Sequence, residues 1–256
     1  MNAIGEMLAR QDPRQRHCES HGVYQSRNIF RDIWTPCPRC SEEAEAKAQV
    51  ERGKHERAEA LARWEKRLGH ACIPVRFKDR RLESYIAETE GQRRALAFAE
   101  AYADSFDDVL RTGRSALLIG RPGTGKTHLA VGIALRIMER DGRTVLFTKV
   151  SDAIRRVTDT WGRGNGETET EAIAALTYPD LLILDEVGMQ SGSNTEKRIL
   201  FDFLDGRYEK QRPTLLVSNL DIDGVQANIG ERVFDRLREN GGEVVVFDWT
   251  SYRGNT

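Results

Sequence analysis

Residues 120–127 read Gly-Arg-Pro-Gly-Thr-Gly-Lys-Thr, which matches the phosphate-binding pattern G-x-x-x-x-G-K-[ST] at every required position. The apolar run 115–119 precedes the motif, as in a buried strand, and apolar residues recur at helical spacing over 129–137. A strand, a glycine-rich loop and a helix in this order form the arrangement in which such a loop holds phosphate. The motif therefore predicts an α/β domain that binds a nucleoside triphosphate.

Each residue type in the loop has a chemical reason. Gly123 and Gly125 allow the backbone to turn its N–H groups toward the phosphates, at the positive end of the following helix. Lys126 supplies a charge for the β- and γ-phosphates, and Thr127 supplies a hydroxyl for Mg²⁺. The residues expected to bind ATP are Gly120, Arg121, Pro122, Gly123, Thr124, Gly125, Lys126, Thr127 and His128.

Two further apolar runs end in polar residues. Residues 180–186, Asp-Leu-Leu-Ile-Leu-Asp-Glu, are typical of a buried parallel strand whose carboxyl end meets a ligand. Asp185 is expected to hold Mg²⁺ through water, and Glu186 to orient and deprotonate an attacking water. Residues 213–219 end in Asn219, a candidate sensor of the γ-phosphate, although an isolated Asn is also a common strand-ending turn residue.

The charge pattern excludes some classes of protein. Charged residues make up 31% of the 256 residues, yet the formal net charge is −1, so the whole chain is not a polyanion-binding tail. Residues 1–80 carry an excess of four positive charges, which is too few to establish nucleic-acid contact. The sequence has no long apolar segment and no signal-peptide core at its N-terminus, so we expect a cytoplasmic protein without a membrane partner.

Cysteine spacing predicts a structural zinc site. Cys18 and His21 are separated by two residues, fifteen residues follow, and Cys37 and Cys40 form a second pair of the same spacing. His17 competes with His21 for the fourth position, but the two-residue gap favours His21. A disulfide, or a hairpin without metal, remains the alternative. Cys72 lies outside the pattern and is expected to be a small packed residue.

The chain divides into three parts on these patterns. Residues 1–68 form a region with the zinc pairs and a helix from 41 to about 68, rich in strong helix formers, which is either a connector, a partner-binding arm or a solvated helix. Residues 69–90 are a linker, and residues 91–256 are the ATPase domain, beginning with a helix over roughly 91–111. The expected strands alternate with helices, which favours a parallel sheet, and lie near 115–120, 144–150, 180–185, 214–219 and 243–248.

Several of these features together carry a resemblance: the Asp185-Glu186 pair, Asn219, residues 230–236 (Gly-Glu-Arg-Val-Phe-Asp-Arg) and residues 248–253 (Asp-Trp-Thr-Ser-Tyr-Arg). From about residue 70 onward the chain resembles the DnaC-type bacterial and phage helicase loaders of the AAA+ ATPases, whose close relatives are the IstB-type transposition helper ATPases. The resemblance implies an α/β AAA+ domain with a sheet of order 5-1-4-3-2. It also implies self-association on ATP and single-stranded DNA, delivery of the replicative DNA helicase, and an N-terminal part that grips this helicase.

The resemblance also implies roles by position. Asn219 corresponds to sensor one, Arg236 to an arginine finger that reaches a neighbouring subunit's ATP, and Arg253 to a second sensor. Arg232 is the alternative finger. A finger supplied across an interface couples hydrolysis to assembly. From the residues alone, both helix arginines could equally form surface ion pairs with nearby acidic residues.

An insertion at residues 151–166 corresponds to a segment that contacts single-stranded DNA in the loaders. The candidates are Arg155, Arg156, Trp161 and Arg163, which combine cations with an aromatic face. The apolar residues at helical spacing in this segment also fit a packed helix with its arginines in water. Two other functions stay open: an ATPase that helps a transposase, and a nucleotide-dependent adaptor with little hydrolysis.

Overall fold

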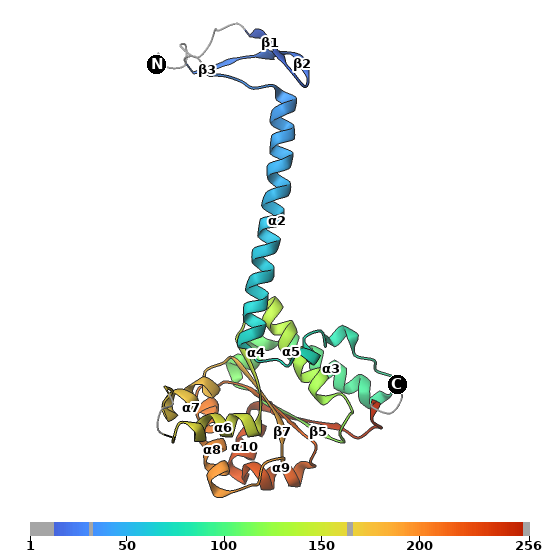
Figure 1. Ribbon diagram of the computed structural model, residues 1–256. Coiled ribbons are helices and arrows are strands. Elements are labelled where there is room, and N and C mark those ends of the chain that lie inside the picture. Colours follow the sequence, from blue (N-terminus) through green and yellow to red (C-terminus); the bar gives the residue numbers. More distant parts are fainter. Residues whose placement is uncertain (1–12, 31–32, 163–165, 253–256) are drawn as a thin grey trace, which may run out of the picture. The chain divides into compact units, whose positions relative to one another are not determined.

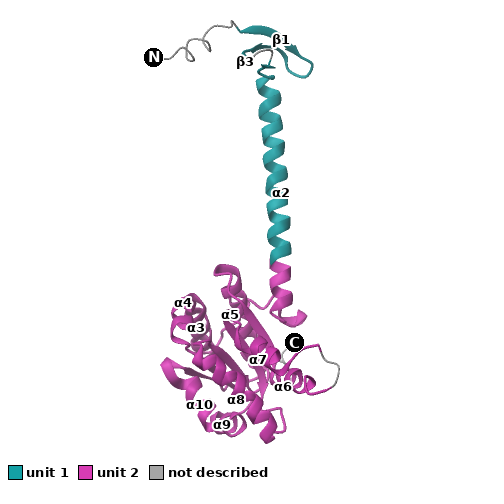
Figure 2. Ribbon diagram, turned by 90° about the vertical axis from the view of Figure 1, so that its left-hand side faces the viewer, with its two compact units in different colours: residues 1–63 teal, residues 64–256 magenta. Residues whose placement is uncertain are grey.

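The computed structural model describes residues 13–30, 33–162 and 166–252, and these divide into two compact units at residues 63 and 64 (Figure 2). Arg163 and Arg253 lie outside the described residues. The first unit begins with two antiparallel pairs of short strands. Their bounds are β1 (Arg14–Cys18), β2 (Gly22–Ser26), β3 (Asn28–Phe30) and β4 (Ile33–Trp34).

A single long helix, α2 (Pro38–His70), continues from the first unit into the second. It starts three residues before the expected Ser41, because Pro38 has the fixed φ that suits a first helical turn. Of its 33 residues Leu68 is buried, which agrees with a composition of Ala, Glu, Lys and Arg. Exposed pairs such as Glu51–Lys54 and Glu59–Arg63 contribute only a few tenths of a kcal/mol each.

The second unit is built on a five-stranded parallel sheet of order β6-β7-β8-β5-β9 (Figure 1). Numbered in chain order within the sheet, this is the expected 5-1-4-3-2, so that prediction is confirmed. The strand bounds are β5 (Ala116–Gly120), β6 (Val145–Lys149), β7 (Leu181–Val187), β8 (Thr214–Ser218) and β9 (Glu243–Phe247).

Helices cover both faces of the sheet because neighbouring strand residues point to opposite sides. Leu118 packs with the layer of α3, α4 and α5, whereas Leu117 packs with the layer of α6 to α10 (Figure 1). The helix bounds are α3 (Glu90–Asp104), α4 (Phe106–Thr112), α5 (Lys126–Arg140), α6 (Val150–Asp159), α7 (Glu169–Thr177), α8 (Asn194–Glu209), α9 (Ile222–Ile229) and α10 (Glu231–Arg238).

The helix expected over 91–111 is two helices in the structure. Ser105 leaves the helical region with φ −100° and ψ 25°, and its hydroxyl donates to the carbonyl of Ala101. A serine that bonds its own backbone in this way competes with helix continuation. Thr89 starts α3 with a capping box to Gln92, which fixes the helix N-terminus one residue earlier than expected.

Residues 71–87, expected as part of a linker, pack against the core of the second unit. They contain two short 3₁₀ helices, η1 (Val75–Phe77) and η2 (Leu82–Ser84), and bury Ala71, Ile73, Leu82 and Tyr85. Leu82 lies so close to Gly132 of α5 that a Cβ there would come within 2.5 Å of its side chain.

Polar contacts also hold this segment in place. Arg81 pairs with Glu139 at 2.5 Å, and Glu83 pairs with Arg136 at 2.6 Å, so both ion pairs join the segment to α5. Cys72 differs from expectation: it is exposed, at a φ of 54°, because the chain turns there between buried neighbours.

Candidate nucleotide site and metal cluster

The phosphate-binding loop lies between β5 and α5, where the motif predicts it. Gly123 and Gly125 adopt φ values of 77° and 97°, which favour glycine. Thr124 is fully buried, and its carbonyl accepts hydrogen bonds from Trp249 Nε1 at 3.0 Å and Tyr85 Oη at 3.3 Å. A Cβ at Gly125 would lie 2.7 Å from the Tyr85 ring. The loop backbone is therefore held in shape by aromatic side chains from outside the motif.

Lys126 and Thr127 occupy the positions that the phosphate chemistry requires. Lys126 Nζ donates to the carbonyls of Gly120 and Arg121 at 2.8 and 2.6 Å. Thr127 Oγ1 donates to Asp185 Oδ2 at 3.1 Å, so a hydroxyl and a carboxylate converge at one point. Hard oxygen ligands of this kind suit Mg²⁺.

Asp185 and Glu186 end β7 in different environments. Asp185 is 7% exposed, and burial raises the pKa of its carboxyl group even though the Glu186 N–H donates to Oδ1 at 2.8 Å. Glu186 has a φ of 59°, which is unusual for a residue with a side chain. It lies at the point where the register of the β7–β8 pair shifts. Its carboxylate pairs with Lys149 Nζ at 2.9 Å. The expected catalytic base is thus held by a cation at the end of β6.

A cavity of about 550 Å³ connects these groups. Its walls include Lys126, Thr127, Asp185, Glu186 and Asn219, so five residues that the sequence assigns to the site meet there. Pro122, Gly123, Gly125 and His128 of the expected set also line it, whereas Gly120, Arg121 and Thr124 form the loop behind it.

The cavity lining also includes residues that the phosphate-binding motif and the strand ends did not indicate: Arg76, Phe77, Arg80, Ser84, Tyr85 and Ile86, together with Tyr252 of the run 248–253. Tyr252 Oη donates to the carbonyl of Ile86 at 2.7 Å, and the backbone N–H of Tyr252 donates to the carbonyl of Gly123 at 3.1 Å. His128 stacks edge-on against Tyr85 at 5.3 Å, and burial lowers the pKa of its imidazole. Apart from the run 248–253, the sequence signals for these residues are the aromatic side chains at 77 and 85.

The two candidate finger arginines lie on α10 in unlike surroundings. Arg236 is ion-paired with Asp205 of α8 and lies over the Tyr208 ring at 4.7 Å, with 18% of its side chain exposed. Arg232, one helical turn earlier, is exposed and lies over Phe201 at 5.0 Å. Arg236 is therefore engaged within its own subunit, and Arg232 faces outward.

The insertion after β6 forms α6 and the turn that follows. Ile154 and Val157 are buried in the core, as the packed-helix interpretation predicts. Arg155 pairs with Asp152 at 3.3 Å and Arg156 with Glu167 at 2.5 Å, both at the surface. Trp161 is 47% exposed and donates from Nε1 to Glu169 at 2.6 Å. The basic and aromatic candidates thus lie near acidic partners.

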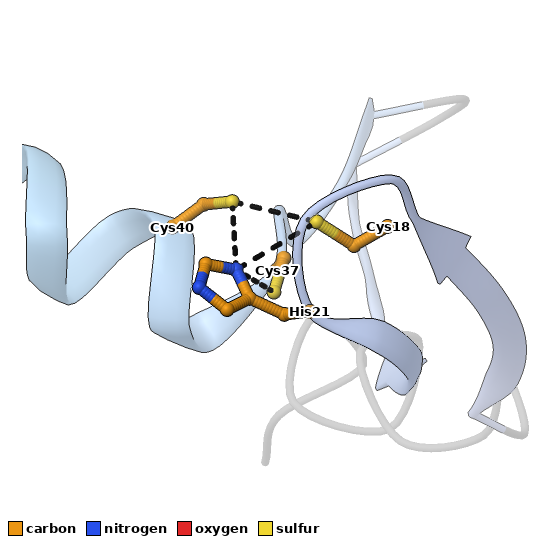
Figure 3. A group of neighbouring side chains, drawn as sticks. All are labelled: Cys18, His21, Cys37 and Cys40. Carbon is orange, nitrogen blue, oxygen red and sulfur yellow. Dashed lines mark hydrogen bonds between the residues drawn. The ribbon is translucent and has the colours of Figure 1, made fainter.

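The four predicted zinc ligands come together in the first unit. Cys18 and His21 lie at the β1–β2 turn, and Cys37 and Cys40 lie at the start of α2 (Figure 3). Their ligand atoms all lie within 4.8 Å of one another. His21 Nδ1 is 3.2 Å from Cys40 Sγ, and Cys18 Sγ is 3.5 Å from Cys40 Sγ. His17, the competing ligand, is opposite Val23 in the β1–β2 ladder.

This geometry fits a tetrahedral ion. Ligands at zinc distances from one centre are separated by about 3.5–3.8 Å, close to the separations seen here. A backbone hydrogen bond from Ser20, together with the Cys40 thiol, lowers the pKa of Cys18, whereas the same contact with Cys18 raises the pKa of Cys40, so Cys18 is the first of the two to become a thiolate. A thiolate is the form of cysteine that binds metal.

A parallel 5-1-4-3-2 sheet, a phosphate-binding loop after β5, and an Asp-Glu pair on β7, which β8 separates from β5, define an AAA+ nucleotide-binding ATPase fold. The comparisons place the chain within this class. The family model described as IstB-like ATP binding protein matches residues 58–255.

Curated relatives narrow the family. The replicative helicase loader DnaC of Escherichia coli (strain K12) is 38% identical over 171 residues, which span 67% of this chain and 68% of that protein. The DnaC of Buchnera aphidicola subsp. Schizaphis graminum (strain Sg) is 36% identical over 186 residues, spanning 73% and 74%. The chain belongs to the IstB-like family of ATP-binding proteins and, within it, to the DnaC-type helicase loaders.

Solved structures show the same fold. A crystal structure of the DnaC helicase loader matches with a TM-score of 0.62 at 23% identity, covering 68% of this chain and 100% of that one. A DnaI crystal structure matches with a TM-score of 0.57 at 19% identity, covering 70% and 94%. Among the described residues, no helix is long and apolar enough to cross a membrane.

Proposed function

We propose that this protein is an ATP-dependent helicase loader, which assembles on single-stranded DNA and delivers a replicative helicase. The observation that carries the proposal is the cavity in which Lys126, Thr127, Asp185 and Glu186 meet, in a chain 38% identical to a replicative helicase loader. DnaA, a neighbour in fold, has been solved with single-stranded DNA, which supports DNA binding by this architecture.

In the proposed mechanism, ATP binds with its phosphates against the loop. Lys126 leaves the carbonyls of Gly120 and Arg121 to reach the β- and γ-phosphates. Thr127 and Asp185 would hold Mg²⁺, which would neutralise charge on the phosphates. Asn219, at the end of β8, lies in the cavity wall where it can contact the γ-phosphate.

Glu186 activates the attacking water, but it must first leave Lys149. Both partners are more than one-third exposed, and such pairs are worth about 0–1 kcal/mol. The ion pair is therefore weak enough for nucleotide or a neighbouring subunit to break. The strand β6 ends at Lys149 and leads directly into α6, which carries Arg155 and Arg156. DNA contacts at these two arginines would therefore act on the strand end that holds Lys149.

We assign the arginine finger to Arg232 rather than to Arg236. The side chain of Arg236 is 18% exposed and lies beside Asp205 of its own subunit, whereas exposed Arg232 is free to reach a neighbour; Arg236, which the family resemblance implies, is the alternative. Arg253 is kept as the candidate second sensor on the family resemblance alone.

The first unit is proposed as a zinc-stabilised docking module for the helicase. A region this small buries little apolar surface, so metal binding supplies much of its folding free energy. One zinc per chain is expected, and the double change of Cys37 and Cys40 to Ser removes it and weakens helicase capture. A metal-free protein that captures helicase normally would contradict this role.

The main test compares two variants of the cavity in a phosphate-release assay with single-stranded DNA and helicase. Lys126→Ala loses tight ATP binding, whereas Glu186→Gln binds ATP and loses turnover, because Lys126 meets phosphate in the ground state and Glu186 acts on the water. Normal hydrolysis by Glu186→Gln would overturn the assignment of the base. Normal helicase loading by Lys126→Ala would overturn the ATP-dependent loader.

A mixing experiment tests the finger. Arg232→Ala and Lys126→Ala subunits are each inactive, but a mixed interface joins an intact Lys126 site to an intact Arg232 and restores hydrolysis. Absence of recovery in assemblies shown to be mixed would refute action between subunits. Full activity of Arg232→Ala alone would refute this choice of arginine.

A further inference from the structure

The two ring nitrogens of His21 face different partners. Nδ1 faces the sulfurs of Cys40, Cys37 and Cys18 (Figure 3), at 3.2–3.8 Å. Nε2 lies 3.0 Å from Oε1 of Glu43. The His21 side chain is 14% exposed and that of Glu43 is 59% exposed. Glu43, which lies outside the four-residue cluster, therefore contacts Nε2, the ring nitrogen that faces none of the three sulfurs.

We propose that Glu43 is the outer carboxylate of the metal site, a positioning residue that holds His21 in the tautomer with its proton on Nε2 and its lone pair on Nδ1. The inference rests on the zinc site proposed above. A neutral imidazole carries one proton, and a carboxylate that accepts the N–H bond at Nε2 leaves Nδ1 free to bind metal. Metal-binding histidines commonly use such a partner, which also fixes the ring orientation.

The position of Glu43 on α2 explains how it reaches the ring. Glu43 follows Cys40 by three residues, so both lie on the same side of the first helical turns. Cys40 contacts the ring at Nδ1 and Glu43 at Nε2, so one helix face holds His21 at two atoms. The β1–β2 turn is thereby joined to α2 by a contact beyond the four ligands.

Glu42 provides a matched control. It is the preceding residue on the same exposed turn, and an α-helix rotates by about 100° per residue, which turns its side chain away from the His21 face. Among the described residues Glu42 makes no contact with His21. Replacing either glutamate by Ala removes the same charge near the metal and favours the helix equally.

The test measures zinc affinity of the full chain by competition with a chromogenic chelator. Glu43→Ala is expected to weaken Zn²⁺ binding about 10-fold, the lower end of the 10- to 100-fold range, because the carboxylate is exposed. Glu43→Gln keeps an oxygen acceptor without the charge and should fall between Glu43→Ala and wild type. Glu42→Ala should bind zinc as the wild type does.

A second readout separates orientation from simple stability. Nitrogen-15 spectra of the zinc-loaded chain should show His21 bound through Nδ1 with its proton on Nε2. Cobalt spectra should show the same three-sulfur, one-nitrogen ligand set in Glu43→Ala.

Equal affinities of Glu43→Ala and Glu42→Ala, or binding of metal through Nε2, would overturn the role of Glu43. A wild-type chain that binds no zinc would instead overturn the metal site itself, so the two failures are distinguishable.

Discussion

The carbonyl oxygen of Thr124 offers a direct test of how the phosphate-binding loop is held. It accepts two side-chain hydrogen bonds, from Trp249 Nε1 at 3.0 Å and from Tyr85 Oη at 3.3 Å, in a fully buried position. Trp249→Phe keeps an aromatic ring beside Phe247, whose ring centroid lies 4.8 Å from that of Trp249, but removes the indole N–H and some of the packed ring atoms. Tyr85→Phe removes the other donor.

The expected magnitudes follow from the number of donors that remain. Either single change removes one neutral hydrogen bond from an acceptor that keeps another, so we expect the low end of the range for such a bond, about 0.5 kcal/mol. The double change leaves a buried carbonyl without either donor, at a cost of about 1–3 kcal/mol for that unsatisfied group beyond the loss of packing. The double variant should therefore lose more than the two single variants combined. In ATP affinity the upper limits are about 2-fold for each single change and about 150-fold for the double change, whereas adding the two single costs would give only about 5-fold.

The assay is titration with a fluorescent ATP analogue, with urea unfolding of the same four proteins to divide the cost between affinity and stability. Trp161→Phe is the control, because Trp161 does not line the cavity and its Nε1 donates to Glu169 at the start of α7. Unchanged affinity and stability in Trp249→Phe would refute the reasoning. Strict additivity in the double variant would refute the shared acceptor.

Three other changes have expected outcomes. Lys149→Met should raise DNA-independent hydrolysis by up to about 5-fold, because it frees Glu186 from a pair worth about 0–1 kcal/mol, and phosphate release measures this. Asp185→Asn should raise the melting temperature of the nucleotide-free protein and abolish further stabilisation by Mg²⁺ and ATP. Burial raises the pKa of the Asp185 carboxyl group, so the contribution of this group to stability falls as the pH rises from its unfolded to its folded pKa. The increase in melting temperature caused by Asp185→Asn should therefore disappear when melting is measured at pH values below that range. Arg207→Met should cost about 2–5 kcal/mol in urea unfolding, because Arg207 is 1% exposed and donates to four backbone carbonyls that would lose this donor.

Sequence patterns predicted those parts of the site in which function requires particular residue types close together in the chain. The loop at 120–127 and the pair at Asp185 and Glu186 are continuous in sequence, so their meeting follows from strand order. The Cys-His pairs are equally local, since two short spacings determine which atoms can share one centre.

The contacts that the sequence did not reveal join residues far apart in the chain. Arg236 pairs with Asp205 on another helix, and no local pattern distinguishes that pairing from a surface contact with Asp235 or Glu239. Glu186 is held by Lys149, which depends on the neighbouring strand of the sheet. Glu43 differs from Glu42 only through a histidine 22 residues away.

Residues 71–87 show why an apparent linker can be part of a site. Their apolar side chains follow neither a helical nor a strand period, and the 3₁₀ turns bury Leu82 and Tyr85 only because α5 is there to receive them.

Residues 71–87 also bring the two ends of the second unit together at the phosphate-binding loop. Tyr85 comes from its N-terminal side and Trp249 and Tyr252 from its C-terminal side, yet all three bind the backbone of Gly123 or Thr124. Tyr252 closes the set by donating to the carbonyl of Ile86. The helix α2 ends at His70, immediately before this segment, and the segment supplies Arg76, Phe77, Arg80 and Tyr85 to the cavity lining. A change in the loop on nucleotide binding therefore acts on the same residues that connect α2 to the ATPase core.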